Sequence, residues 1–147
     1  MTLADTERPQ MLPTSPPHAA GASAGASGRV GPAAGWVRIC ALEDLEVERG
    51  RAALLGEEQV ALFLTHGGRV FAVSNLDPYS GAHVISRGIV GTKQDAPTVA
   101  SPMYKQVFDL RTGSCLETQG KDAYSLQVWP VAVDANGDVF IKWKAAS

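Results

Sequence analysis

Between Trp36 and Trp143, short apolar segments alternate with glycine-containing turns, and this rhythm is the strongest restriction on the fold. The three predicted hairpins join Gln59–Thr65 to Arg69–Ser74, Gln106–Leu110 to Ser114–Leu116, and Ser125–Asp134 to Asp138–Trp143. Two further strands are expected at Trp36–Cys40, which alternates apolar and polar residues, and at Arg51–Leu55. The pattern favours an all-β domain, either a small sandwich or an open barrel of antiparallel hairpins.

The remaining segments predict little helix. Only Ala41–Gly50 and Gly81–Gly88 offer room for a helical turn or two. Pro130 interrupts the last hairpin and predicts an edge position or a bulge, because proline cannot donate a ladder hydrogen bond. The connection Asn75–Ser101, rich in Gly, Pro and Asp, is expected to be one long loop, and long ordered loops are usually functional.

The start of the chain has a different composition. Ala, Gly, Pro and Ser fill 21 of the first 35 positions, and no aromatic residue occurs there. Such a segment cannot bury enough apolar surface to offset its ordering entropy, so we predict that Met1–Gly35 is disordered. It also lacks the basic start and apolar core of a secretory signal. Trp36–Ser147 is then expected to form one domain.

Composition excludes several classes of function. The formal net charge of -2 gives no broad positive field for phosphates, so no nucleic-acid partner is expected. No apolar run approaches the roughly 18–20 residues that a membrane helix needs, so no membrane association is expected. Two cysteines are too few for a disulfide scaffold. The chain is therefore expected to be a cytoplasmic protein.

The stretch Ser101–Leu116 contains the run Phe108-Asp109-Leu110-Arg111-Thr112-Gly113. It resembles the second ligand loop of Rieske iron–sulfur domains, which typically reads Cys-Pro-x-His-Gly-x-x-Phe-Asp-x-x-Thr-Gly-x-Cys. The first ligand loop of that family, Cys-x-His after a strand, aligns with Asn75-Leu76-Asp77. The resemblance covers nearly all of Trp36–Trp143. It implies a Rieske-like fold in which two long loops meet at one end.

In that alignment the four positions of the cluster ligands are Asn75, Asp77, Ser101 and Tyr104, and Lys105 stands where the family has a glycine. A Rieske centre needs two thiolates on one iron and two imidazoles on the other. An amide, a carboxylate, a hydroxyl and a phenol do not retain a sulfide-bridged pair of irons. We therefore predict neither a cofactor nor a metal in this chain.

Other chemistry has weaker signals. His83 with Asp77 and Asp95 leaves open a mononuclear metal site, although histidine ligands normally occur in denser sets. Cys40 and Cys115 are expected to pack as small apolar residues. The chain has neither a Gly-x-Ser-x-Gly nucleophile motif nor a phosphate-binding glycine loop. We therefore predict no catalytic residue, and no catalysis by this chain alone.

Three segments are similar to the small subunits of assimilatory NADH-dependent nitrite reductases, a Rieske-like group that lacks the cluster ligands. They are Asn75-Leu76-Asp77-Pro78-Tyr79-Ser80, Ser86-Arg87-Gly88-Ile89-Val90-Gly91, and Pro97-Thr98-Val99-Ala100-Ser101-Pro102 followed by Lys105-Gln106 and Phe108-Asp109. Gly88 and Gly91 are expected to serve positions of positive φ.

This resemblance implies one partner, a large subunit that carries FAD, a [4Fe–4S] cluster and sirohaem. That subunit reduces nitrite to ammonium with NADH, in the assimilation of nitrate and nitrite. The present chain would be its accessory subunit. Two alternatives stay open. The first is that the chain is a Rieske-type [2Fe–2S] electron-transfer protein, and the second is that it is a ligand-free Rieske-like module of another oxidoreductase.

Convergence of the two ligand loops would place a set of apolar, aromatic and basic residues at one end of the domain: Pro78, Tyr79, Arg87, Met103, Tyr104 and Lys105. Aromatic, Met and Arg residues are enriched in interface cores, so these are candidates for the partner interface. The alternative is that Tyr79 and Tyr104 fill the space of the missing cluster. Arg87 is also a candidate to form an ion pair with Asp77 or Asp109. The alternative is that its side chain is solvated, as is usual for arginine.

Overall fold

The computed structural model describes residues 10–11 and 35–143. Its strands are β1 (Gln10–Met11), β2 (Trp36–Ala41), β3 (Arg51–Leu55), β4 (Glu58–Leu64), β5 (Val70–Ser74), β6 (Ile89–Lys93), β7 (Ala96–Ala100), β8 (Val107–Asp109), β9 (Cys115–Glu117), β10 (Val128–Trp129), β11 (Val131–Val133) and β12 (Asp138–Lys142). Two 3-10 helices, η3 (Leu42–Asp44) and η4 (Ile85–Arg87), are the only helices among the described residues. The expectation of an all-β fold is confirmed.

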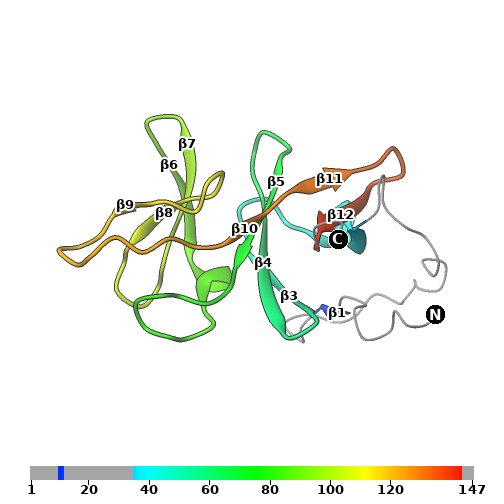
Figure 1. Cartoon of the computed structure of the whole chain (residues 1–147). Helices are drawn as coiled ribbons and strands as arrows, with labels where there is room; N and C mark the ends of the chain where they lie inside the picture. The colour runs from blue at the N-terminus through cyan, green and yellow to red at the C-terminus, as the bar shows by residue number, and fades with distance from the viewer. Residues whose placement is uncertain (1–9, 12–34, 144–147) are drawn as a thin grey trace.

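The strands form three antiparallel sheets (Figure 1). The five-stranded sheet, in the order β1-β3-β4-β5-β10, lies between the three-stranded sheet β11-β12-β2 and the four-stranded sheet β6-β7-β8-β9. One hydrophobic core fills each gap between sheets. In Figure 1 the four-stranded sheet is on the left and β11 and β12 are on the right.

The middle layer explains the apolar run in β4. Val60 and Leu62 pack into the core shared with the three-stranded sheet, whereas Ala61 and Phe63 pack into the core shared with the four-stranded sheet. All four side chains are fully buried. Successive side chains of a strand point to opposite faces, so a strand covered on both sides needs a continuous apolar sequence.

The three predicted hairpins are present as β4–β5, β8–β9 and β11–β12. Pro130 lies between β10 and β11, at the point where the chain leaves the five-stranded sheet and enters the three-stranded one. The strand after it, β11, is an edge strand, as the proline predicted.

The expectation of one long loop from Asn75 to Ser101 is wrong in its second half, which folds as the hairpin β6–β7. Its turn consists of Gln94 and Asp95, whose φ values of 51° and 72° are of the kind that glycine adopts most easily. The sequence offers no glycine at this turn, and Pro97 lies within β7. Both features conceal the hairpin from sequence reasoning.

Two loops remain at one end of the four-stranded sheet, and we name them by their residues. The first loop (residues 75–84) follows β5, and the second loop (residues 101–106) joins β7 to β8. They lie next to each other at the lower left of Figure 1. The expected positive φ is wrong for both glycines: Gly88 follows η4 with a φ of -75°, and Gly91 lies within the extended strand β6. A Cβ at Gly88 would instead collide with the Ala100 carbonyl oxygen, and the glycine permits this close approach of backbone to β7.

Part of the first 35 residues is described. Gln10 and Met11 of β1 pair with Leu54 and Ala53 of β3, at the edge of the five-stranded sheet. The Gly35 carbonyl accepts a hydrogen bond from the Trp143 backbone N–H at 2.9 Å. The rest of the segment predicted to be disordered, residues 1–9 and 12–34, lies outside the described residues.

Deleting residues 1–34 is expected to change the melting temperature by no more than about 3 °C. The described contact that is lost is a two-residue ladder at a sheet edge. A loss of roughly 1 kcal/mol moves the melting temperature of a domain of this size by at least about 3 °C. Thermal unfolding of both forms, followed by circular dichroism, measures the difference. A larger drop would show that the segment contributes to the stability of the domain.

No helix among the described residues is long and apolar enough to cross a membrane.

Candidate functional site

A buried hydrogen bond joins the two loops at the positions that align with cluster ligands. Ser101 Oγ donates to Asp77 Oδ2 at 2.6 Å, and both residues are 0% exposed. Asp77 Oδ1 accepts from the Tyr79 backbone N–H at 2.8 Å, and Ser101 Oγ accepts from the Met103 backbone N–H at 3.1 Å. Each side-chain oxygen of the pair is therefore hydrogen-bonded, which a buried carboxylate requires.

Asn75, the other ligand position of the first loop, is also buried and fully bonded. Its Nδ2 donates to Gln59 Oε1 at 3.0 Å and to the His83 carbonyl at 3.3 Å. Its Oδ1 accepts from the Ser86 backbone N–H at 2.7 Å. Asn75 thus ties the first loop to β4 and to η4, and it holds the loop in shape through side-chain hydrogen bonds.

The fourth ligand position, Tyr104, is 53% exposed, so its ring lies at the surface. Lys105, at the position of the family's glycine, has a φ of 67°. Its backbone N–H donates to the Ser101 carbonyl at 3.1 Å and closes the turn. The left-handed conformation that a glycine would adopt easily is retained here by a lysine.

A [2Fe–2S] cluster does not fit this set of residues. Asn75, Asp77 and Ser101 are bonded to the protein itself, and Tyr104 is exposed. The donor atoms are an amide, a carboxylate and a hydroxyl where the cluster requires thiolates and imidazoles. Across the described part of the chain, no group of three or more His, Cys, Asp or Glu side chains is placed to hold a metal ion.

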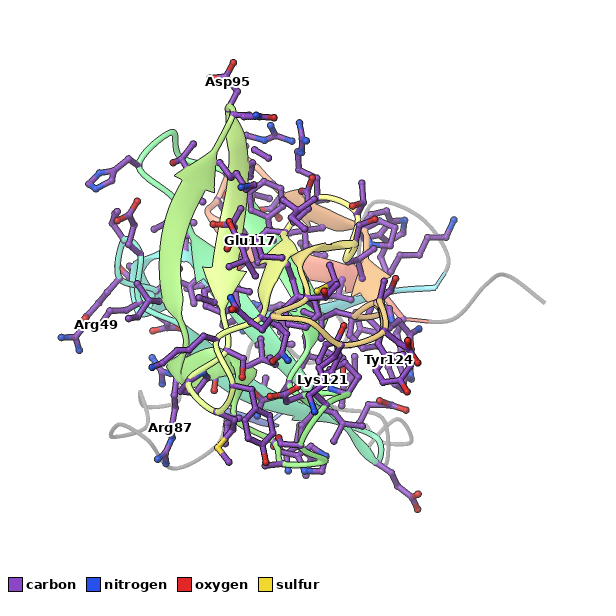
Figure 2. The ribbon with its side chains drawn as sticks, turned by 90° about the vertical axis from the view of Figure 1, so that its left-hand side faces the viewer. Arg49, Arg87, Asp95, Glu117, Lys121 and Tyr124 are labelled. Atoms are coloured by element: carbon purple, nitrogen blue, oxygen red, sulfur yellow. The ribbon has the colours of Figure 1, made fainter. Side chains whose placement is uncertain are left out.

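The alternative of a mononuclear site at His83, Asp77 and Asp95 is therefore not supported. Asp95 lies in the turn of the β6–β7 hairpin, at the top of Figure 2 and far from Arg87 and Lys121 in its lower part. Asp77 is bonded to Ser101.

Cys40 packs in the core between the three-stranded and five-stranded sheets, as expected. Burial raises the pKa of the Cys40 thiol to about 12, so it stays protonated and unreactive at neutral pH. Cys115 is half-buried against the other core, and the Tyr79 hydroxyl contacts its Sγ at 3.5 Å.

The family-like run from Phe108 to Gly113 forms a turn. Asp109 accepts hydrogen bonds from the Arg111 backbone N–H at 2.8 Å and from Arg111 Nη2 at 2.9 Å. The hydrogen bonds from Arg111 hold the pKa of the Asp109 carboxyl below its ordinary value. Gly113 has a φ of 83°, and a Cβ there would collide with the Leu126 carbonyl. These contacts explain why the turn needs Asp and Gly.

The suggested pairing of Arg87 with Asp77 or Asp109 is wrong. The Asp77 carboxylate accepts a hydrogen bond from Ser101, and the Asp109 carboxylate forms a salt bridge with Arg111. Arg87 is exposed and points outward in Figure 2. The two loops are joined by the serine–aspartate hydrogen bond in place of an arginine.

The six predicted interface residues differ in their exposure to solvent. Arg87, Met103, Tyr104 and Lys105 are exposed, and Pro78 is half-buried. Tyr104 therefore does not fill the space of a cluster. Sequence reasoning missed Leu76, which lies between two of the replaced ligand positions and is also exposed. An apolar residue at the centre of a ligand loop is the signal that could have identified it.

Tyr79 is half-buried and holds another segment in place. Its hydroxyl donates to the Asp122 carbonyl at 2.6 Å and accepts from the Tyr124 backbone N–H at 2.9 Å. Its ring packs against Phe108 and Tyr124, with centroids 6.1 Å and 4.9 Å away. Tyr79 thus anchors residues 122–124 to the first loop.

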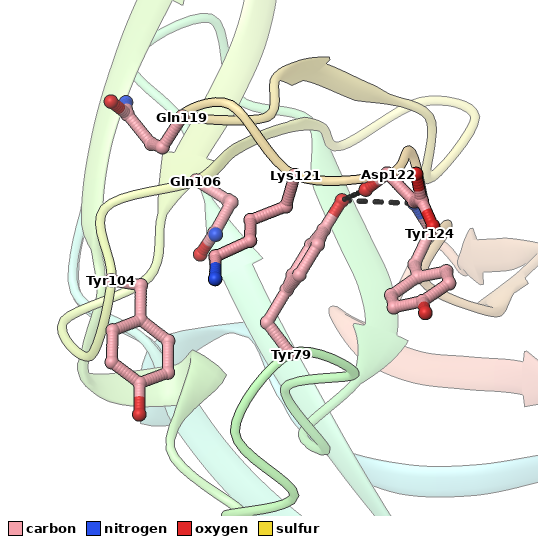
Figure 3. Close-up of a pocket in the computed structure, with 7 residues that line it drawn as sticks. All are labelled: Tyr79, Tyr104, Gln106, Gln119, Lys121, Asp122 and Tyr124. Carbon is pink, nitrogen blue, oxygen red and sulfur yellow. Dashed lines mark hydrogen bonds between the residues drawn. The ribbon is translucent and has the colours of Figure 1, made fainter.

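Beside the two loops lies a groove of about 610 Å³ (Figure 3). Its lining residues are Tyr79, Tyr104, Gln106, Gln119, Lys121, Asp122 and Tyr124. Gln106 is 0% exposed, and its Oε1 has no hydrogen-bond partner among the described residues. Sequence reasoning did not identify the groove, because its two walls come from segments separated along the chain.

Comparison with known proteins gives consistent results. The sequence model of the Rieske-like [2Fe-2S] domain family matches residues 35–142. The nitrite reductase (NADH) small subunit of Escherichia coli (strain K12) is 46% identical over 85 residues, which are 57% of this chain and 79% of that protein. A crystal structure of an NADH-dependent nitrite reductase small subunit from Mycobacterium tuberculosis is similar with a TM-score of 0.69 and 42% identity. The match covers 76% of this chain and 96% of that chain.

A third relative is a much longer protein. The nitrite reductase [NAD(P)H] large subunit of Klebsiella oxytoca contains a segment 42% identical to this chain over 110 residues. The match covers 75% of this chain but 11% of that protein. In that protein, a domain similar to this chain is thus part of the same polypeptide as the large subunit.

Proposed function

The chain belongs to the Rieske-like [2Fe-2S] domain family, and within it to the NADH nitrite reductase small subunits, and from this membership we propose how it works. It binds the large subunit of a cytoplasmic NADH-dependent nitrite reductase and supports the reduction of nitrite to ammonium. FAD, a [4Fe–4S] cluster and sirohaem reside in the large subunit. The small subunit contributes a binding surface and no redox centre.

The observation that carries this proposal is the hydrogen bond between Asp77 and Ser101. It joins the two loops at the positions where an electron-transferring relative would need a cluster. Three of the four ligand positions are bonded within the protein and Tyr104 is exposed, so this end of the domain offers no set of residues to hold a cluster that passes electrons. Its contribution to an oxidoreductase is then structural, through contact with the subunit that carries the cofactors.

The Klebsiella protein supports the choice of partner. A domain 42% identical to this chain is covalently continuous with a nitrite reductase large subunit there. Two domains that occur in one polypeptide in one organism and as separate chains in another commonly act together. We therefore propose that this chain, as a separate subunit, binds a nitrite reductase large subunit.

The end of the domain formed by the two loops is the proposed contact surface. It presents Leu76, Met103 and Tyr104, three large apolar or aromatic side chains that are each at least 40% exposed. Arg87 and Lys105 are also exposed there. Exposed aromatic and Met side chains beside basic residues have the composition of an interface core.

Reconstitution of the complex distinguishes the proposed function from the alternative that the chain is a ligand-free module of another oxidoreductase. Purified large subunit is assayed for NADH-dependent consumption of nitrite with and without the full chain. We expect this chain to form a complex with the large subunit and to raise its activity or its lifetime in the assay. No complex and no effect at micromolar concentrations of both proteins would contradict the proposed function.

A further inference from the structure

The groove beside the two loops combines polar atoms that need a partner with aromatic walls. Gln106 is buried, and its Nε2 donates to the Thr118 carbonyl at 3.4 Å. This hydrogen bond orients the amide so that Oε1 is the atom left without a partner in the described structure. Figure 3 shows the Gln106 amide at the floor of the groove, pointing toward the ammonium end of Lys121.

Lys121 is the second polar group of the groove. Its side chain is exposed and forms no salt bridge within the part of the chain that the structure describes. A buried carbonyl oxygen requires an N–H or O–H donor, and an ammonium group requires an acceptor. The groove therefore offers one acceptor and one donor on the same side.

The primary amide of an Asn or Gln side chain matches this pair, because one of its N–H groups lies on the same side as its carbonyl oxygen. Its N–H can donate to Gln106 Oε1 while its carbonyl oxygen accepts from Lys121 Nζ. A flat amide also packs well against the tyrosine rings that form the walls, Tyr79, Tyr104 and Tyr124. A phosphate or nucleotide fits less well, because Asp122 offsets the charge of Lys121 and the buried oxygen of Gln106 would face another acceptor.

We propose that this groove receives a loop of the large subunit, which inserts an amide group between Gln106 and Lys121. This inference rests on the proposed function and adds to it the site and the chemistry of recognition. Tyr104 lines both the groove and the proposed contact surface, so the two are continuous. A lining rich in tyrosines is typical of surfaces that bind polypeptides.

The test is the affinity of the full chain for the purified large subunit, measured by isothermal titration calorimetry. Gln106→Met keeps the length of the side chain and removes both amide atoms. We expect at least about tenfold weaker binding and little change in the melting temperature of the isolated chain, because removing a buried oxygen without a partner offsets the loss of the hydrogen bond to the Thr118 carbonyl. Lys121→Met should weaken binding as well. The double variant should lose less than the product of the two effects, because both side chains bind the same amide.

Lys142→Met is the matched control, since Lys142 is exposed on β12 in the three-stranded sheet, away from the groove. It should bind as the wild type does. Wild-type affinity in both Gln106→Met and Lys121→Met would overturn the inference while leaving the proposed function intact. Because Lys121 is exposed, its variant keeps the test valid even if Gln106→Met does not fold. Failure of the wild-type chain itself to bind would overturn both.

Discussion

Replacing Asp77 by alanine is expected to lower the free energy of unfolding by about 3 kcal/mol. The substitution removes both acceptors of a fully buried carboxylate, leaving the Ser101 hydroxyl and the Tyr79 backbone N–H without partners. An unsatisfied buried donor costs about 1–3 kcal/mol, and the cavity left by the truncated side chain adds to the loss. Urea denaturation of the isolated chain, followed by tryptophan fluorescence, measures the change.

Two further variants sharpen this result. Ser101→Ala removes the hydrogen bond from the other side and should cost about 2 kcal/mol, because one carboxylate oxygen is then left without its donor. Glu57→Ala removes an exposed carboxylate from the turn between β3 and β4 and should stay within about 0.5 kcal/mol. Equal, small effects for all three would mean that the hydrogen bond between the loops does not stabilise the fold.

Tyr104→Ala and Lys105→Glu are each expected to weaken binding to the large subunit by about tenfold or more. Tyr104 is 53% exposed, and Lys105 is exposed beside it, so neither side chain is needed to fill the core. The melting temperature of the isolated chain should barely change. Nitrite-reducing activity at limiting small subunit should fall in parallel with affinity.

The matched controls are Val133→Ala and Lys142→Glu. Val133 and Lys142 are exposed on β11 and β12, in the sheet opposite the two loops. They should leave binding and activity unchanged. Wild-type affinity in the Tyr104 and Lys105 variants would place the interface on another face. A loss of roughly 3 kcal/mol of stability in Tyr104→Ala would instead identify the tyrosine as part of the core.

Most strands could be predicted from the sequence, because apolar alternation and glycine turns are local signals. The segment Trp36–Cys40 and the hairpin around Gly67 and Gly68 needed nothing more. The hairpin β6–β7 could not be predicted, because Gln94 and Asp95 adopt positive φ without glycine. The backbone there follows the pairing of β7 with β6 and β8, which is a tertiary constraint.

The candidate site was predictable only in part. The loss of ligand chemistry at Asn75, Asp77, Ser101 and Tyr104 is visible in the residue types alone. The contact that joins the loops in place of a cluster depends on the distance between them, which the residue types do not give. The sequence suggested an arginine for that task, and the structure uses a serine hydroxyl on an aspartate at 2.6 Å. Packing between segments far apart in sequence decides which side chains of the loops are buried in the core and which remain exposed.

Hydrogen bonds hold the two loops in the arrangement that an iron–sulfur cluster would otherwise fix by covalent ligation. Asp77 and Ser101 connect the loops, and Asn75 fastens the first loop to Gln59 and Ser86. Each of these side chains is buried with its polar atoms satisfied, so the end of the domain is preorganised before any partner binds. A preorganised surface loses less conformational entropy on association.

The iron content of the purified full chain tests the central claim most directly. The chain is produced with ample iron, isolated without oxygen, and analysed for iron and acid-labile sulfide per mole of protein. We expect a colourless protein without stoichiometric iron, because the four ligand positions carry no thiolate and no imidazole. About two irons and two sulfides per chain would contradict the account.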